Sequence, residues 1–494
     1  MKYNSTRNSA LSVNAARAIN DGISKEGGLF VPTELPKLDK EFFVKLSKMN
    51  YIDRAKEVLG LFLTDFTEEE IAVCANGAYS GTFDNDVPAP LHRLDDNTSV
   101  LELWHGPTCA FKDMALQILP YLLTTSSKKV ADGQTTVILV ATSGDTGKAA
   151  LEGFKDVPNT KIIVFYPVDG VSKAQKLQMM TQQGDNVYVC AIKGNFDDAQ
   201  TGVKKIFTDP SVAEKLSENG MAFSSANSIN WGRLLPQIVY YISAYCDLIA
   251  EKGDIDCFNV VVPTGNFGNI LAAYYAKKMG APIKKLICAS NSNKVLTDFI
   301  STGVYDRNRS FYTTISPSMD ILISSNLERL IYDMSGNNSD ELSSYMSKLA
   351  TEGKYEVSDA IKAKLGDEFV GGYATDDETK ATVSATFDKF GYLADTHTGV
   401  AIKVYNDYVN ETGDFTETVI VSTASPYKFA ADVLDAVKPC EDNPTGVEAM
   451  DVLSKTTDTT IPTPLRDLDR REVRFTDVCD ADDMIKAVYT NLGI

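Results

Sequence analysis

Short apolar segments alternate with helix-like segments along the middle of the chain, and this alternation restricts the fold more than any other feature. The clearest unit is the β-branched run at 135–142, which is followed by a glycine turn at 143–147 and a helix-forming stretch at 148–154. Similar apolar runs occur at 161–166, 186–192, 258–262, 285–289 and 416–422. Continuous apolar strands that alternate with helices predict an α/β fold of mostly parallel, twisted sheets flanked by helices.

The 494 residues are enough for two or three structural units. Residues 1–98 are predicted to form a mainly helical region, with helical runs at 41–49 and 66–71 and with Thr67 placed to cap the second. A smaller α/β domain is expected at 99–230, and a larger one with a C-terminal extension at 231–494. The stretch 301–390 is expected to be helical.

The charge of the chain excludes several classes of partner. The chain has 48 Lys and Arg against 67 Asp and Glu, a net charge of -19, which disfavours nucleic acid and anionic membranes. Eight cysteines are scattered without a C-x-x-C pair, and we expect a soluble cytoplasmic protein because no signal peptide or long apolar stretch is apparent. The three histidines are far apart, so no metal site is assigned.

Two strand-to-helix loops could bind anions. The loop at 263–269 (PTGNFGN) places two glycines before a helix, a combination suited to one phosphate group, although it matches neither a dinucleotide fingerprint nor a P-loop. The loop at 143–147 (SGDTG) offers hydroxyls and amides that suit a carboxylate. A tight turn in the first loop and ordinary helix capping in the second remain open alternatives.

The segment at 104–113 (WHGPTCAFKD) places Lys112 in an apolar, turn-rich setting. A lysine that loses hydration has a lowered amine pKa and can act as a Schiff-base nucleophile. A solvated surface lysine is the alternative for this residue.

Several motifs together resemble the threonine synthase family of the longer microbial and fungal type. They are STRN (5–8), EGGLFVP (26–32), LELWHGPTCAFKDMALQ (101–117), TSGDTGKAAL (142–151), PTGNFGNI (263–270) and DTHTGVA (395–401). The resemblance implies a fold-type II pyridoxal phosphate enzyme that converts O-phospho-L-homoserine and water into L-threonine and phosphate.

The same resemblance implies a role for each loop. Lys112 would be the catalytic residue and would hold the cofactor covalently. The other cofactor-binding residues would be Gly265, Asn266, Phe267, Gly268 and Asn269 at its phosphate, Asp145 at its phenolic oxygen and Thr423 at its pyridine nitrogen. The substrate-binding residues would be Ser143, Gly144, Thr146, Asn227, Ser228 and Arg233, the last gripping the substrate phosphate.

Some features leave room for other interpretations. A shared proton is expected at Asp145, because an ionised acid would repel the phenolic oxygen. The segment 227–233 could instead be a capped helix start, and Asn8, Ser425 and Tyr427 depart from the usual family pattern.

Two other functions stay open. One is a lyase of the same fold that releases 2-oxobutyrate, and the other is a non-catalytic ligand-binding relative. The expected partner is a small-molecule substrate, without nucleic acid or membrane, and the chain is expected to be a monomer or homodimer.

Overall fold

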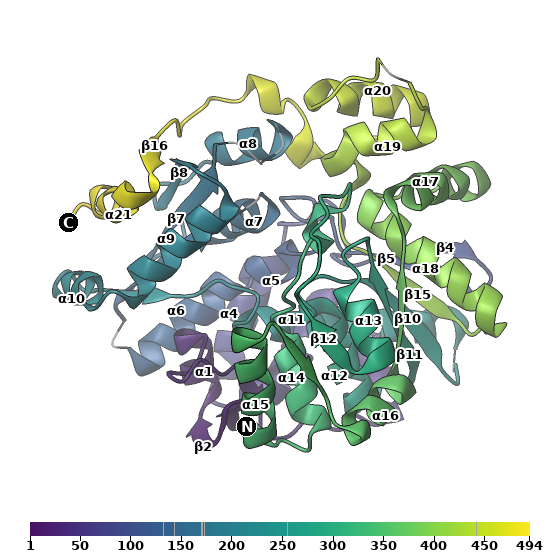
Figure 1. The fold of residues 1–494 in the computed structure, drawn as a ribbon, viewed down its shortest axis with the longest axis horizontal. Coiled ribbons are helices and arrows are strands. Elements are labelled where there is room, and N and C mark those ends of the chain that lie inside the picture. The colour runs from purple at the N-terminus through teal and green to yellow at the C-terminus, as the bar shows by residue number, and fades with distance from the viewer. Residues whose placement is uncertain (132, 143, 169–170, 172, 254, 441) are drawn as a thin grey trace.

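Two sheets, one of five strands and one of six, organise the chain, and helices flank both (Figure 1). The computed structural model describes residues 1–131, 133–142, 144–168, 171, 173–253, 255–440 and 442–494. The α/β fold predicted from the sequence, with mostly parallel sheets flanked by helices, is confirmed.

The five-stranded sheet has the order β16-β8-β7-β6-β9, and all its neighbouring strands are parallel. Its strands are β6 Thr135–Ala141, β7 Thr160–Pro167, β8 Val187–Lys193, β9 Met221–Ser224 and β16 Val478–Asp480. Its helices are α7 Asp145–Phe154, α8 Lys173–Met180, α9 Phe196–Thr208, α10 Pro210–Glu218 and α21 Met484–Leu492. Nearly every side chain of β6 and β7 is buried, as expected for parallel strands covered on both faces.

The six-stranded sheet has the order β14-β11-β10-β15-β5-β4, and only the edge strand β4 runs antiparallel to its neighbour. Its strands are β4 Leu91–Asp95, β5 Thr98–Glu102, β10 Phe258–Pro263, β11 Ile283–Ser290, β14 Phe369–Tyr373 and β15 Thr418–Ser422. Helices around it include α12 Gly268–Met279, α13 Val295–Thr302, α16 Asp359–Glu368, α17 Asp376–Phe390, α18 Thr396–Thr412 and α19 Ala430–Val437.

The N-terminal region combines helices with a small antiparallel sheet of order β2-β1-β3. Its elements are β1 Tyr3–Ser5, β2 Asn8–Val13, β3 Phe30–Pro32, α1 Ala15–Asp21, α2 Lys40–Ser47, α3 Tyr51–Phe62 and α4 Glu68–Tyr79. Thr67 caps α4 in a capping box with Glu70, as its position in the sequence predicts. The small sheet was not expected, and the division of the chain at 98 and 230 stays a prediction.

Helix α11, Trp231–Lys252, runs through the centre of the molecule (Figure 1). Its side chains are buried nearly all round over the first five turns, which is typical of a helix inside a large core. Trp231, fully buried, meets Tyr3 edge-to-face at 5.5 Å and Phe62 at 5.7 Å between ring centroids. The N-terminal region therefore packs directly on the helix that also carries Arg233.

Helices α5 Asp113–Leu116 and α6 Leu119–Val130 follow the Lys112 segment. Further helices are α14 Leu327–Met334, α15 Ser339–Thr351 and α20 Val447–Thr457. No helix within the described ranges is both long and apolar enough to span a membrane.

The expected strands all form, with ends that move by one or two residues. The expectation of a helical stretch at 301–390 is wrong in three places, where β12 Val304–Asp306, β13 Lys354–Glu356 and β14 occur. Strand β14 contains Gly371 and Gly372, which give it low β-propensity. Gly371 is required there because a Cβ would lie 2.9 Å from Thr297 Cα of the neighbouring helix α13.

A glycine also sets the approach of α7 to α5, the helix that follows Lys112. A Cβ on Gly153 would lie 2.0 Å from the Leu116 carbonyl oxygen, so the two backbones could not keep this separation. We expect Gly153→Ala to lower the free energy of unfolding by about 1–3 kcal/mol, measured by denaturant titration.

Gly366→Ala is the matched control. Gly366 is exposed in α16. Apart from its chain neighbours and the backbone of its own helix, no heavy atom of the described residues lies within 4 Å of the position that an added methyl group would take. This change should stabilise the protein by up to about 1 kcal/mol, because alanine favours a helix over glycine. Equal stability of the two variants would contradict the packing role of Gly153.

Candidate active site

Lys112 lies beside the loop that follows β15. The Phe111 amide donates to the Thr423 carbonyl at 2.8 Å, and the Ser425 amide donates to the Cys109 carbonyl at 3.0 Å. These two bonds join the Lys112 segment to the carboxyl edge of the six-stranded sheet, where ligands of parallel α/β sheets bind. Lys112 and Thr423 are therefore brought together, as the sequence predicts.

The Lys112 side chain is largely shielded from solvent, with 15% of it exposed. Burial lowers the pKa of its ammonium group, and the charges of Lys428 and Arg233 lower it further, whereas Asp145 opposes the shift. The alternative of a solvated surface lysine is therefore wrong. A desolvated amine of this kind loses its proton more readily and is a better nucleophile.

Two carboxylates and a histidine fix the loop before Lys112. His105 lies between Asp84 and Glu102, with Nδ1 2.8 Å from Asp84 and Nε2 2.9 Å from Glu102. Burial by itself lowers the pKa of His105, but the two carboxylates raise it to about 9. At neutral pH the charged imidazolium of His105 therefore pairs with both carboxylates and holds this loop in place.

Thr142 organises the turn at the end of β6. Its hydroxyl oxygen accepts hydrogen bonds from the amides of Gly144 and Gly147, both at 2.9 Å. Gly144 has a φ of 142°, a conformation that only glycine adopts readily. Thr146 is half-buried beside it, and Ser143 lies outside the described residues.

Asp145, at the first turn of α7, contacts two lysines. Its Oδ2 lies 3.8 Å from Lys112 Nζ, and its Oδ1 lies 2.9 Å from Lys428 Nζ. Burial by itself raises the pKa of Asp145, but the charges of Lys428 and Lys112 outweigh it and lower the pKa well below its ordinary value. The carboxylate is therefore ionised, and Lys428 is a partner that the sequence analysis missed. This lowered pKa disfavours the shared proton expected at Asp145.

The glycine loop opens α12 through a left-handed residue, Phe267, at φ 64°. Gly265 leaves no room for a side chain, because a Cβ would lie 2.5 Å from the Ser318 carbonyl oxygen. The Asn326 amide donates to the Asn266 carbonyl at 3.0 Å. The loop thus turns sharply into α12, and no side chain of the described residues caps the start of this helix, which suits an anion site at its first amides.

Two tyrosines of α11 hold the Asn269 side chain by hydrogen bonds. Its Oδ1 accepts from the hydroxyls of Tyr240 and Tyr241, each at 2.6 Å, whereas its buried Nδ2 has no hydrogen-bond partner in the described part of the chain. An unpaired buried donor at a helix start suits an anionic ligand.

Arg233 lies inside the molecule, 3% exposed, on the first turn of α11. Its Nη1 donates to the Ala226 carbonyl at 2.7 Å, and its Nε has no partner among the described residues. Burial lowers its pKa to about 10, so it stays charged at neutral pH. A buried guanidinium with a spare donor is suited to binding an anion.

The neighbouring segment is partly exposed. Asn227 lies at the surface and Ser228 is half-buried, and the Ser228 hydroxyl donates to Asn227 Oδ1 at 3.3 Å. Neither residue caps α11, because the cap is Asn230, whose side chain accepts from the Gly232 amide at 2.8 Å. Capping of α11 therefore explains Asn230 but neither Asn227 nor Ser228, and Asn227 Oδ1 also accepts from the Ile229 amide at 3.3 Å.

The motif at 395–401 supports the glycine loop from behind. His397 Nε2 accepts from the Ser318 amide at 3.1 Å, so its Nδ1 carries the proton and donates to Asp395 at 2.7 Å. Ser318 is the residue whose carbonyl packs against Gly265. Asp395 also caps α18, so the motif fixes the loop to this helix.

The N-terminal motifs at 5–8 and 26–32 are connected to the site by contacts with α14. Arg7 pairs with Glu328 at 2.7 Å, and the neighbouring Arg329 is fully buried. Arg329 donates to Asn326 Oδ1, to the Phe30 carbonyl at 3.0 Å and to the Ile229 carbonyl at 2.6 Å. These contacts tie the glycine loop to the segment before α11, and no local pattern in the sequence indicates them.

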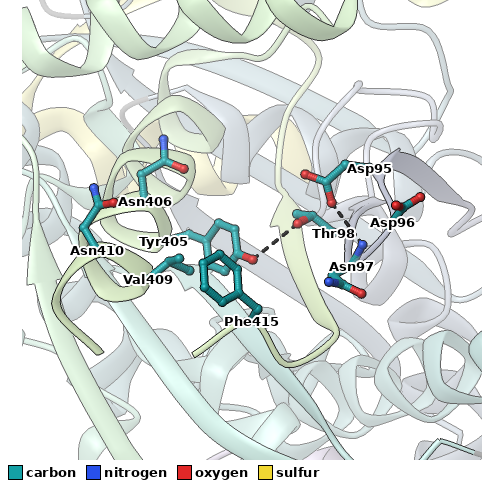
Figure 2. A pocket seen from close by; sticks show the side chains of 9 residues that line it. All are labelled: Asp95, Asp96, Asn97, Thr98, Tyr405, Asn406, Val409, Asn410 and Phe415. Atoms are coloured by element: carbon teal, nitrogen blue, oxygen red, sulfur yellow. Dashed lines mark hydrogen bonds between the residues drawn. The ribbon is translucent and has the colours of Figure 1, made fainter. Parts of the chain in front are cut away.

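A surface hollow lies away from Lys112. It has a volume of about 520 Å³ and is lined by residues that include Asp95, Asn97, Thr98, Tyr405 and Phe415 (Figure 2). Thr98 pairs with Thr418 at the amino ends of two parallel strands, whereas Thr423 follows the carboxyl end. The hollow is therefore at the wrong edge of the sheet for the chemistry of Lys112. Within the described ranges, no three His, Cys, Asp or Glu side chains are grouped to hold a metal ion.

Comparisons with known proteins agree with one another over nearly the whole chain. Three families match: "Threonine synthase N terminus" at residues 2–79, "Pyridoxal-phosphate dependent enzyme" at 87–425 and "Threonine synthase, C-terminal" at 398–488. The chain is 37% identical over 430 residues to a threonine synthase of Pseudomonas aeruginosa, covering 87% of this chain and 89% of the relative.

Two further comparisons extend this result. A crystal structure of a PLP-bound threonine synthase from Brucella melitensis matches with a TM-score of 0.89 and 36% identity, covering 100% of this chain and 99% of that one. Threonine synthase-like 1 of Homo sapiens is 41% identical over 444 residues, which is 87% of this chain. The chain spans only 59% of the length of that relative.

Proposed function

The chain belongs to the threonine synthase family of pyridoxal-phosphate-dependent enzymes, and we propose that it converts O-phospho-L-homoserine and water into L-threonine and phosphate. One observation carries the proposal: the Arg233 guanidinium is buried, its Nε has no partner among the described residues, and its positive charge helps to lower the pKa of Lys112. A cation poised for an anion beside a reactive amine suits a phosphorylated amino acid.

The residues present fit pyridoxal phosphate. Lys112 supplies a desolvated amine for its aldehyde, and the amides that follow Phe267 at the start of α12 suit its phosphate. Thr423 is buried next to the Lys112 segment, where a hydroxyl could meet the pyridine nitrogen. We therefore assign the cofactor phosphate to Gly265, Asn266, Phe267, Gly268 and Asn269.

Substrate binding is assigned to the two remaining loops. Gly144 and Thr146, together with Ser143, would bind the substrate carboxylate at the start of α7, where the helix dipole favours negative charge. Arg233 would grip the substrate phosphate through its planar fork, and Asn227 and Ser228 would add neutral donors.

When bound, pyridoxal phosphate supplies an electron sink for charge that develops on the substrate carbons. Lys112 Nζ would remove the proton from the α carbon and pass it on, which frees the amine to take a proton from the β carbon. It would return protons to the substrate after the phosphate has left and water has added. Burial lowers the pKa of this amine and so favours the neutral form that such transfers require. Arg233 would hold the departing phosphate close enough to activate the water.

An assay of the purified protein tests the proposal. With pyridoxal phosphate and O-phospho-L-homoserine, the protein should release phosphate and threonine in equal amounts. Release of 2-oxobutyrate in place of threonine would identify the elimination reaction, and absence of both products would contradict an enzymatic role on this substrate.

We also propose a cytoplasmic location and a monomeric or homodimeric state. All eight cysteines are free thiols, which supports a reducing compartment. Light scattering during gel filtration separates a monomer or dimer from a larger assembly.

Replacement of Lys112 tests the cofactor anchor. Lys112→Ala should fold, lose the visible absorbance of the bound cofactor and reduce turnover by about 10³-fold or more, because the reacting amine is gone. Lys148→Ala is the control, since Lys148 is a buried lysine of α7 that pairs with Glu152 at 3.0 Å. The control should keep the absorbance. Borohydride labelling of another lysine would overturn the assignment.

Replacement of Arg233 tests the substrate phosphate site. A bidentate charge-assisted contact in a shielded pocket contributes about 2–4 kcal/mol, so Arg233→Ala should lower kcat/KM by about 30- to 1000-fold. Arg233→Lys should recover only part of the loss, because an ammonium group keeps the charge but not the fork. The cofactor absorbance should not change in either variant. Wild-type kcat/KM in Arg233→Ala would show that Arg233 is structural.

A further inference from the structure

Lys428 is a buried lysine that joins three loops of the site. It lies on the short 3-10 helix Pro426–Phe429, just after β15, and 1% of its side chain is exposed. Its Nζ lies 2.9 Å from Asp145 Oδ1 and donates to the Thr108 carbonyl at 2.8 Å. One ammonium group thus links the loop after β15, the first turn of α7 and the loop before Lys112.

The Thr108 end of this link is fixed. The Thr108 amide and hydroxyl both donate to the buried Asp113 carboxylate, at 2.8 and 2.7 Å. The next residue, Cys109, has a φ of 57°, a left-handed conformation that the surrounding contacts must hold in place. The Thr108 carbonyl that binds Lys428 Nζ therefore lies on a rigid turn. This contact fixes the position of the ammonium group, which in turn holds the Asp145 carboxylate.

The two oxygens of Asp145 face different lysines. Oδ1 lies 2.9 Å from Lys428 and accepts from Gln175 Nε2 at 2.9 Å, whereas Oδ2 is 3.8 Å from Lys112. The shorter contacts are those to Lys428 and Gln175, so they hold the carboxylate. Lys112 is left within electrostatic range of Asp145 without a close hydrogen bond to it.

We propose that Lys428 is a positioning residue for Lys112 and acts through Asp145. By holding the carboxylate at one oxygen, it keeps Asp145 from closing onto the Lys112 nitrogen, which stays available for the cofactor and for proton transfer. This inference rests on the role proposed above for Lys112. It assigns to Lys428 a task that the loop motifs of the sequence do not indicate.

The charges around Lys112 support this role. Asp145 and Asp113 favour the protonated form of the Lys112 nitrogen, and Lys428 and Arg233 oppose it. Without Lys428, Asp145 would have Lys112 as its nearest remaining cation and would be free to approach it. The closer carboxylate would raise the pH at which this nitrogen loses its proton, and the lost repulsion would add a smaller rise that does not depend on Asp145.

The test is a pH titration of the visible absorbance of the holoenzyme, without substrate. Lys428→Met removes the charge and keeps the length of the side chain. We expect its titration midpoint to rise by about 1 pH unit or more relative to the wild type. An unchanged midpoint would overturn the proposal.

An Asp145→Asn background separates action through Asp145 from direct repulsion. If Lys428 works through the carboxylate, then Lys428→Met should shift the midpoint much less in Asp145→Asn than in the wild type. A shift of full size in that background would mean that Lys428 acts on Lys112 directly, which contradicts a positioning role.

Lys148→Met is the matched control for loss of a buried lysine. Lys148 lies on the same helix as Asp145 but pairs with Glu152 and with Gln182. Its variant should keep the wild-type midpoint even if it unfolds at a lower temperature. A midpoint shift equal to that of Lys428→Met would show a general effect of destabilisation and overturn the proposal.

If Lys428→Met does not retain the cofactor, the same titration is made with Lys428→Arg. A guanidinium group preserves the charge and a carboxylate contact, so the midpoint should stay near that of the wild type, and a rise of a full unit would contradict the proposal. The titration uses no substrate, so a failure to form threonine would overturn the proposed function alone.

Discussion

Excess positive charge, buried where the loops of two sheets meet, is the constraint on which the site depends. Lys112, Lys428 and Arg233 are shielded from water, and Asp145 is the carboxylate that contacts the two lysines. Buried charges are costly unless the surrounding structure holds them in good geometry. The rigid turn at Thr108, the cap at Asn230 and the buried helix α11 provide that support, and the remaining positive charge suits a ligand with anionic groups.

The N-terminal region takes part in this support although it carries none of the proposed catalytic residues. Tyr3 and Phe62 pack on Trp231 at the start of α11, and Arg7 pairs with Glu328 on α14. Arg329, next to Glu328, donates hydrogen bonds both to the Phe30 carbonyl of β3 and to the Ile229 carbonyl. The N-terminal motifs of the sequence therefore have a physical role, because they fix the position of the two loops proposed to bind phosphate.

Local patterns predicted the parts of the fold that depend on local physics. The apolar runs became β6, β7, β8, β10, β11 and β15, because strands buried on both faces need continuous apolar sequence. Strands that are short or rich in glycine were not predicted, and β14 is an example. Position 371 in this strand requires glycine because the Thr297 backbone lies too close for a side chain. The family resemblance added the roles of the loops, which single patterns left open between anion binding and ordinary capping.

The sequence by itself determined the order of strands, loops and helices, the candidate lysine and the family, since each of these is carried by short contiguous motifs. Only the tertiary structure decided which charges meet. Lys428 and Thr108 are 320 residues apart and come into contact because β15 lies next to β5 in the sheet. Coulomb and hydrogen-bond partners of this kind depend on strand order and on exclusion of water, and neither is visible in a local sequence pattern.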